Sequence, residues 1–166
     1  MEIRTINSLA DFKEAHALID AMSKWDSEQS RKFGVPDDEL IEYIYGHTPE
    51  TLMEKFNKRD AGFFLARIGE NIAGCAGYSK SDDGIAELQK MYVRPEARGK
   101  GVARGLMTAC LAGIRNDGYM TVRLETVTFM SEAIALYDAF SFERSGYLRS
   151  VPPSLQPITI FMERQV

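Results

Sequence analysis

The feature that most constrains this chain is the stretch from Glu87 to Leu106, where a strand pattern runs into a basic, glycine-containing loop and then into a helix pattern. Residues 91–93 (Met-Tyr-Val) suit a half-buried strand. Pro95 ends that strand, because proline has no N–H for a sheet ladder. The loop 98–101 (Arg-Gly-Lys-Gly) follows, and apolar residues from Val102 onward recur at helical spacing. The sequence therefore predicts a strand, a turn, a loop and a helix in direct succession.

Basic residues crowd the start of the predicted helix, at Arg94, Arg98, Lys100 and Arg104. The first N–H groups of a helix lack partners within it, and its dipole favours negative charge at that end. Two interpretations stay open, a bound phosphate and a solvated charged turn. The spacing does not fit G-x-x-x-x-G-K-[ST], because the two glycines are separated by one residue and no Ser or Thr follows the lysine. It does not fit G-x-G-x-x-G, because Gly105 comes one place too late.

The run V-R-P-E-A-R-G-K-G-V-A (93–103) resembles the acetyl-coenzyme A loop of the GCN5-related N-acetyltransferase (GNAT) superfamily. Arg98, Gly101 and Ala103 satisfy its R/Q-x-x-G-x-G/A pattern, and Val93 and Pro95 satisfy the preceding V-x-P. The resemblance implies acetyl-CoA as cofactor, with its pyrophosphate on the loop amides and its pantetheine arm along the strand. The implied cofactor-binding residues are Met91, Tyr92, Val93, Arg98, Gly99, Lys100, Gly101, Val102, Ala103, Arg104 and Ser131.

A second run, from Ala133 to Glu143, resembles the superfamily's N-x-x-A-x-x-L-Y-x-x-x-G-F signature. Two positions depart from it. Met130 occupies the place of the usual Asn, so the polar contact to the cofactor falls to Ser131 or is absent. Ser141 replaces the usual Gly, and serine suits a left-handed helix cap less well than glycine does.

The resemblance implies acetyl transfer from a thioester to an amine by direct attack, since no convincing Cys-His or Ser-His pair offers a covalent route. It assigns the general acid to Tyr137, which could equally be a core residue of its apolar helix face. It assigns the base to Glu87, on the face that period two gives to Glu87, Gln89, Met91 and Val93. Glu125, a water chain, or a surface ion pair at Glu87 are the alternatives. The N–H near Met91 is the implied oxyanion donor.

The remaining patterns predict one domain over 1–166, an α/β (or α+β) fold with a mixed, mostly antiparallel sheet of about seven strands flanked by helices. Helical spacing follows Ser8, the chain turns polar from Ser23 to Pro36, and further helical patches follow Asp37 and Pro49. Predicted strands occupy 2–6, 62–68, 72–79, 85–93, 121–127 and 158–162, and Phe142 and Tyr147 open another.

Composition bounds the function. With 166 residues, 45% hydrophobic, 27% charged and a net charge of −4, the chain reads as an ordinary soluble protein without a general nucleic-acid surface. Two histidines and two cysteines give no metal cluster, and Cys75 and Cys110 are expected to be buried thiols. We expect a cytoplasmic location without membrane contact, and a homodimer is compatible with the family. The acceptor is a small-molecule or peptide amine of open identity, lined in one interpretation by Trp25, Tyr43 and Tyr45. The rival function is a non-catalytic acyl-CoA-binding or regulatory module.

Overall fold

The structure is a computed structural model that describes residues 1–146 and 149–166, so the predicted strand residue Tyr147 lies outside the described part. The strands are β1 (Glu2–Thr5), β2 (Gly62–Ile68), β3 (Asn71–Asp82), β4 (Ile85–Val93), β5 (Thr121–Val127), β6 (Glu143–Arg144) and β7 (Thr159–Gln165). The helices are α1 (Leu9–Ser30), α2 (Asp37–Leu40), α3 (Pro49–Phe56), α4 (Val102–Asn116) and α5 (Ser131–Ala139). A 3₁₀ turn (Arg31–Phe33) follows α1, a π-helical turn (Ile41–Tyr45) follows α2, and a further 3₁₀ turn (Pro95–Ala97) precedes α4.

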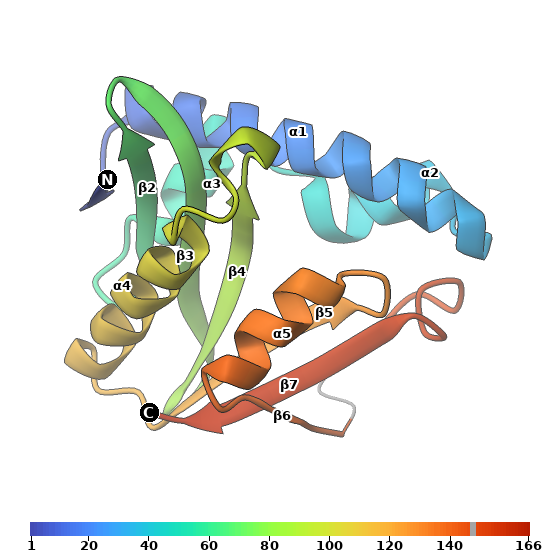
Figure 1. Cartoon of the computed structure of the whole chain (residues 1–166). Coiled ribbons are helices and arrows are strands. Elements are labelled where there is room, and N and C mark those ends of the chain that lie inside the picture. Colours follow the sequence, from blue (N-terminus) through green and yellow to red (C-terminus); the bar gives the residue numbers. More distant parts are fainter. Residues whose placement is uncertain (147–148) are drawn as a thin grey trace.

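The strands form one seven-stranded sheet in the order β1-β2-β3-β4-β5-β7-β6 (Figure 1). Every neighbouring pair is antiparallel except β4 and β5, which are parallel because α4 carries the chain across between them. The β2–β3 and β3–β4 connections are two-residue turns with Gly69 and Gly84 at positive φ. The predicted mixed, mostly antiparallel fold is confirmed.

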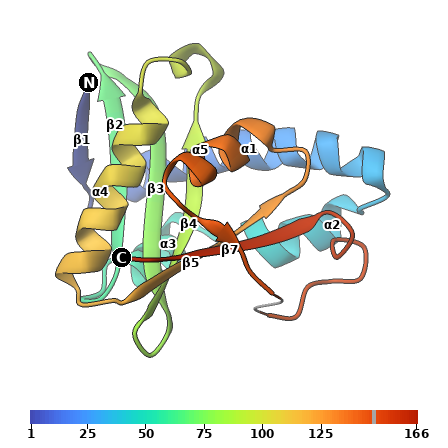
Figure 2. The ribbon, with the colours of Figure 1, turned by 60° about the horizontal axis from the view of Figure 1, so that its bottom comes forward.

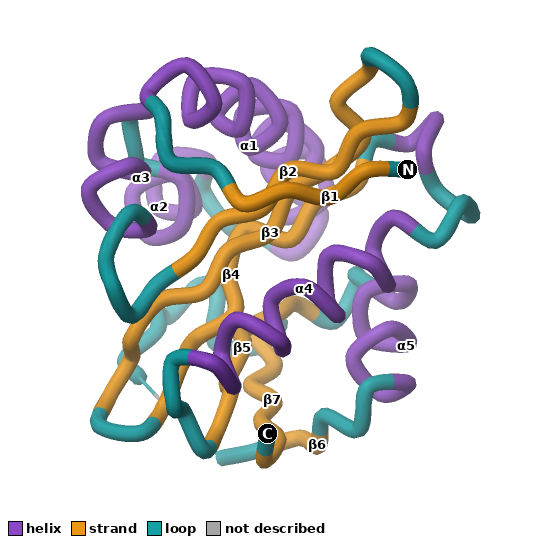
Figure 3. The backbone as a smooth tube through the Cα atoms, turned by 90° about the vertical axis from the view of Figure 1, so that its left-hand side faces the viewer, coloured by secondary structure: helices purple, strands orange, loops and turns teal. Residues whose placement is uncertain are grey.

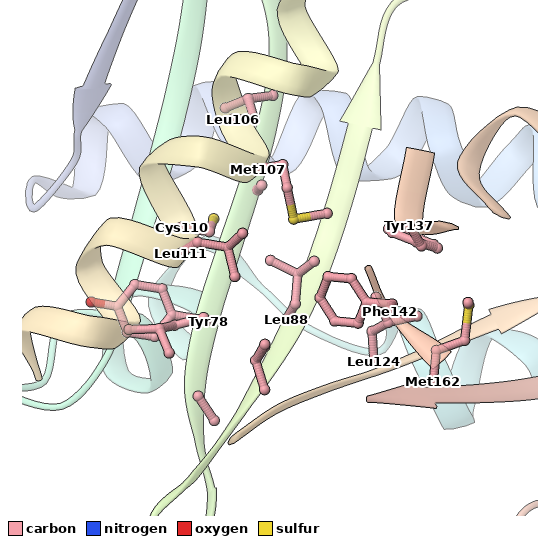
Figure 4. Packing of buried hydrophobic residues seen from close by; sticks show 14 of the residues in the cluster. Tyr78, Leu88, Leu106, Met107, Cys110, Leu111, Leu124, Tyr137, Phe142 and Met162 are labelled. Carbon is pink, nitrogen blue, oxygen red and sulfur yellow. The ribbon is translucent and has the colours of Figure 1, made fainter. Parts of the chain in front are cut away.

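Helices cover both faces of the sheet (Figure 3). α4 and α5 lie on one face, and α1, α2 and α3 lie on the other. Figure 4 shows the core of the first face, where Met107 and Leu111 of α4 lie next to Leu88, with Leu124 and Phe142 toward α5. Cys75 and Cys110 are free and buried, as predicted. None of the helices in the described ranges is long and apolar enough to span a membrane.

The first helix is longer than its apolar spacing indicates. It begins at the Ser8 cap, whose hydroxyl accepts from the Asp11 N–H. It then continues through the polar segment that starts at Ser23 and ends only at Ser30. The extension packs against the π-helical turn, where the Tyr45 hydroxyl donates to Asp26, and Asp26 and Ser30 are buried in consequence.

The parallel pair at the centre of the sheet separates after three residue pairs. Ile85, Ala86 and Glu87 pair with Thr121 to Arg123, and beyond them β4 pairs only with β3 while β5 pairs only with β7. Figures 1 and 2 show the two strands diverging from their paired ends. The space between them is where side chains from both faces of the sheet meet.

Candidate functional site

Two cavities occupy the region where β4 and β5 diverge. The larger, of about 620 Å³, lies against the start of α4. The smaller, of about 150 Å³, lies on the side of α1 and the π-helical turn. Met22, Met91, Met130 and Ala133 line both, so the two cavities adjoin there. Such an arrangement can bring two different molecules into contact.

The larger cavity gathers nearly all the residues predicted to bind a cofactor. Lys100, exposed at the tip of the loop, is not among the described residues that line it. The ten that do are Met91, Tyr92, Val93, Arg98, Gly99, Gly101, Val102, Ala103, Arg104 and Ser131. Trp25, which one interpretation of the sequence placed at the acceptor, lines this larger cavity rather than the smaller one and contacts the ring of Phe129 edge-on at 5.9 Å.

The loop before α4 has the backbone that its glycines suggest. Gly99 and Gly101 have φ of 71° and 79°, in the left-handed region that favours glycine. Gly101 is the N-cap of α4, and no side chain caps that end. The hydrogen bond from the Gly105 N–H to the Gly101 carbonyl opens the helix, so the preceding N–H groups point out of its first turn toward the cavity wall. An anionic ligand suits this site.

The start of α5 forms the opposite wall. Met130, at the usual asparagine position, is the N-cap of α5, and no side-chain hydrogen bond caps the helix. Ser131 is exposed at its first residue. At the other end, Ser141 adopts φ of 61°, so the left-handed conformation normally given to glycine persists here with serine.

A β-bulge interrupts β4 beside the junction of the cavities. Cys75 pairs with Tyr92 and Gly77 with Gln89, so two residues of β4 oppose one of β3, and Lys90 has φ of 57°. The bulge reverses the alternation of side chains. Met91 and Val93 therefore pack with Leu88 on the α4 face. The prediction that Glu87, Gln89, Met91 and Val93 share one face is wrong, because a one-residue insertion shifts a period of two by half.

Arg149 joins the two candidate bases in the smaller cavity. Its guanidinium lies 3.2 Å from Glu87 and 2.5 Å from Glu125. The hydroxyl of Tyr43 donates to Glu125 at 3.1 Å, and desolvation by burial together with that carboxylate raises the pKa of Tyr43 to about 12. Glu87 and Glu125 thus lie in one ion-pair network. From the sequence, an ion pair at Glu87 was an alternative to its role as base.

Two lysines line the same cavity, and each donates a hydrogen bond to a neighbouring group. Lys55 donates to the Gln89 side chain, and Lys90 donates to the carbonyl of Ile44 in the π-helical turn. Burial and the charge of Lys55 lower the pKa of Lys90 to about 8. Burial and the same two lysines lower the pKa of His47 to about 4, so this imidazole is neutral near pH 7.

Tyr137 projects from α5 into the smaller cavity and is 6% exposed. Its ring packs edge-on against Phe142 at 5.9 Å. Burial raises its pKa to about 12, so the hydroxyl carries its proton at neutral pH and can donate it. The residue is both a member of the core beneath α5 and a lining residue of the cavity.

Sequence reasoning missed the side chains that give the smaller cavity its charge. These are Lys55, Lys90 and Arg149, together with Asp26, whose carboxylate accepts a hydrogen bond from Tyr45. They come from α1, α3, β4 and the segment before β7. No motif spaces them along the chain. The one available signal was the polar segment after Ser23, which contains Asp26, but its sequence does not show that this aspartate is buried.

Comparison with known proteins identifies relatives of this arrangement. Residues 19–142 match the acetyltransferase (GNAT) family. The chain is 43% identical over 74 residues to the uncharacterized N-acetyltransferase YjgM of Escherichia coli, an alignment covering 45% of this chain and 44% of YjgM. It is 29% identical over 113 residues to the IAA acetyltransferase of Azospirillum brasilense, covering 68% of this chain and 72% of that one. The chain thus spans less than half the length of YjgM.

Solved structures share the fold over the whole chain. The PaiA N-acetyltransferase of Thermoplasma acidophilum, crystallised in complex with coenzyme A, superposes with a TM-score of 0.75 at 18% identity and covers 100% of both chains. At that identity the likeness is one of fold.

Proposed function

We propose that this chain, which belongs to the acetyltransferase (GNAT) family, transfers the acetyl group of acetyl-CoA to a primary amine. One observation carries the proposal. A large cavity that ends on the open N-terminus of α4 adjoins a small, charged cavity at the point where β4 and β5 part. A bulky anionic donor and a small polar acceptor would fill the two and meet between them.

The residues present fit coenzyme A. The open N–H groups at the start of α4 and the side chains of Arg98 and Arg104 suit its pyrophosphate. Gly99 and Gly101 carry no Cβ, which lets a phosphate approach the backbone closely. Met91 and Val93, beyond the bulge, line the same cavity and would lie along the pantetheine arm. Lys100 contributes charge from the exposed side of the loop.

The reaction is a direct transfer. The amine nitrogen attacks the thioester carbonyl carbon, the C–N bond forms, and the C–S bond breaks as the thiolate leaves. The nitrogen gives up a proton to a base and the sulfur takes one from an acid. The Met91 N–H, beside the bulge, is our candidate donor to the oxygen that becomes negative during the attack.

We assign the acid to Tyr137 and the base to Glu87. The Tyr137 hydroxyl is protonated at neutral pH and lies in the cavity wall that Ala133 shares with the cofactor side. Glu87 lies in the smaller cavity, where Arg149 holds its carboxylate in place. Glu125 binds the same guanidinium and Tyr43, so we give it the role of anchoring Arg149.

The test is release of free CoA thiol from acetyl-CoA in the presence of a panel of primary amines, together with calorimetric titration of CoA. We expect CoA to bind and at least one class of amine to release thiol above the rate of hydrolysis. Binding without turnover across the panel would favour a non-catalytic acyl-CoA-binding module. Absence of CoA binding would overturn the proposal.

The proposal also treats residues 1–166 as one domain acting in the cytoplasm. All seven strands belong to one sheet, which supports a single folding unit. Two buried free thiols suit a reducing compartment. A single cooperative unfolding transition, and recovery of the native protein in the cytoplasmic fraction, are the expected results.

A further inference from the structure

One carboxylate oxygen in the smaller cavity lacks a hydrogen-bond partner. Asp26 is 3% exposed and lines the cavity from α1. The Tyr45 hydroxyl donates to its Oδ2 atom. Its Oδ1 atom is buried and has no partner among the described residues. Such groups are rare, because leaving a buried polar atom unsatisfied costs about 1–3 kcal/mol and more when it is charged.

The cationic side chains that line this cavity already have partners, so none of them neutralises the lone oxygen. Lys55 has Gln89, Lys90 has the Ile44 carbonyl, and Arg149 has both glutamates. The side chain that donates to Asp26 is a neutral phenol, that of Tyr45. The unmet requirement of this wall is therefore for a hydrogen-bond donor, and best for a cationic one, since buried carboxylates are normally paired with cations.

Asp26 lies close to the junction of the two cavities, where the acetyl group would be transferred. Met22 and Asp26 lie four residues apart on α1, which places them about 6 Å apart along the helix axis on one face. Met22 lines both cavities, whereas Asp26 lines only the smaller one. Asp26 therefore lies one helical turn from the junction, on the acceptor side.

We infer that the acceptor carries a second ammonium group, which binds Asp26 Oδ1 while the other nitrogen is acetylated at the junction. This inference rests on the proposed function. The cavity of about 150 Å³ is smaller than the sites that hold drug-sized ligands, so the acceptor is a short alkyl diamine. The spacing of about 6 Å between the junction and Asp26 matches a chain of roughly four methylenes between the nitrogens.

Four matched amines test the inference on the unaltered protein. They are 1,4-diaminobutane, 1-aminobutane, 4-amino-1-butanol and 4-aminobutanoate, which differ only in the group at the far end. With acetyl-CoA saturating, we expect kcat/KM for the diamine to exceed that for each of the others by about tenfold or more. 1-Aminobutane and 4-aminobutanoate bring no donor to the buried oxygen, and the alcohol brings a neutral donor in place of a cationic one. Equal values, or a preference for the alcohol or the carboxylate, would overturn the inference.

The variant Asp26→Asn keeps the shape of the side chain and removes its charge. We expect the diamine preference to collapse to about the value for 1-aminobutane, with calorimetric CoA affinity unchanged. Glu28→Gln is the matched control, an exposed carboxylate two residues along α1. It should leave the preference intact. An equal loss for all four amines in Asp26→Asn would contradict the inference.

The two levels of the argument fail differently. If other primary amines release CoA thiol and the diamine does not, the diamine inference fails and the acetyltransferase proposal stands. If CoA does not bind, the proposed function itself fails.

Discussion

The two adjoining cavities are built in contrasting ways. The larger draws mainly on three short stretches, 91–93, 97–104 without Lys100, and 129–133, and its anion-binding end is made of backbone N–H groups. The smaller is made of side chains from α1, α3, the π-helical turn, β4, β5 and Arg149, which hold one another in place. Backbone built into a local motif can recur with many surroundings, whereas a network of distant side chains is particular to one protein. We therefore expect the loop of the larger cavity to be common in the family, and the side chains of the smaller cavity to determine which acceptor this protein uses.

The largest expected effect is on turnover alone. Tyr137→Phe removes the proposed proton donor, and we expect kcat to fall about 10²- to 10³-fold with the KM for acetyl-CoA unchanged. Steady-state kinetics measure both. Tyr119→Phe, which loses only a hydrogen bond to the Asp60 carbonyl, is the control and should leave kcat unchanged. A change in acetyl-CoA affinity would show that Tyr137 also contributes to cofactor binding, and the two cavities would then not have separate roles.

The second prediction concerns backbone in the larger cavity. Gly101→Ala adds a Cβ at φ of 79°, and Gly118→Ala adds one at φ of 82° at the far end of α4. Neither Cβ meets a neighbour within 4 Å, so both variants carry the same backbone strain. Only at position 101 does the new atom stand where a phosphate would lie.

We expect Gly101→Ala to weaken CoA binding about 30-fold, roughly 2 kcal/mol, and Gly118→Ala to leave it unchanged. Calorimetry of both folded proteins measures the difference. Equal affinities would show that the loop does not bind the pyrophosphate.

The third prediction concerns the free energy of unfolding, which the buried carboxylate of Asp26 lowers at neutral pH. Burial raises the pKa of Asp26 to about 6, although the Tyr45 hydrogen bond opposes the shift. Between pH 4 and pH 6 the folded protein therefore holds a proton that the unfolded chain releases. The stability that this proton contributes is fully present below about pH 4 and is lost as the pH rises through 6.

Asp26→Asn should therefore unfold with a free energy higher by about 3 kcal/mol at pH 7.5, and by little or nothing at pH 4. Urea denaturation at the two pH values measures the change. A variant less stable than the parent at pH 7.5 would show that a partner already satisfies the carboxylate.

The smallest expected effect lies on the cofactor side. Ser141 has φ of 61°, a conformation that costs a residue with a Cβ roughly 1 kcal/mol. Ser141→Gly should raise the free energy of unfolding by nearly that amount, less the added freedom of glycine in the unfolded chain. The control is Ser81→Gly at an exposed serine of β3 without a positive φ, which should not stabilise. Turnover should be unaffected by Ser141→Gly, since only local backbone changes.

Local patterns predicted the parts of this structure that depend on local physics. The strand, loop and helix around Gly101 follow from residue types at fixed spacing, and the resemblance to the family signature pointed to a left-handed site at Ser141. The bulge at Lys90 did not, because one inserted residue leaves no compositional mark and alternation resumes after it.

Longer-range features escaped prediction for a different reason. The polar second half of α1 is helical because it packs on the π-helical turn that holds Tyr45, and nothing in the segment itself shows what it packs against. Arg149 is separated from Glu87 by more than sixty positions, and only the completed sheet brings the two together. Candidate residues were therefore predictable singly, and their network was not.

Three methionines, Met22, Met91 and Met130, line the passage where the cavities adjoin. Methionine is unbranched and has three rotatable bonds, so it adapts to the volume beside it instead of setting a fixed limit. If the transferred group rests there, the wall around it is pliant, and thioesters one carbon longer should still be accommodated. Comparing propionyl-CoA with acetyl-CoA as donors would show how far that tolerance for acyl length extends.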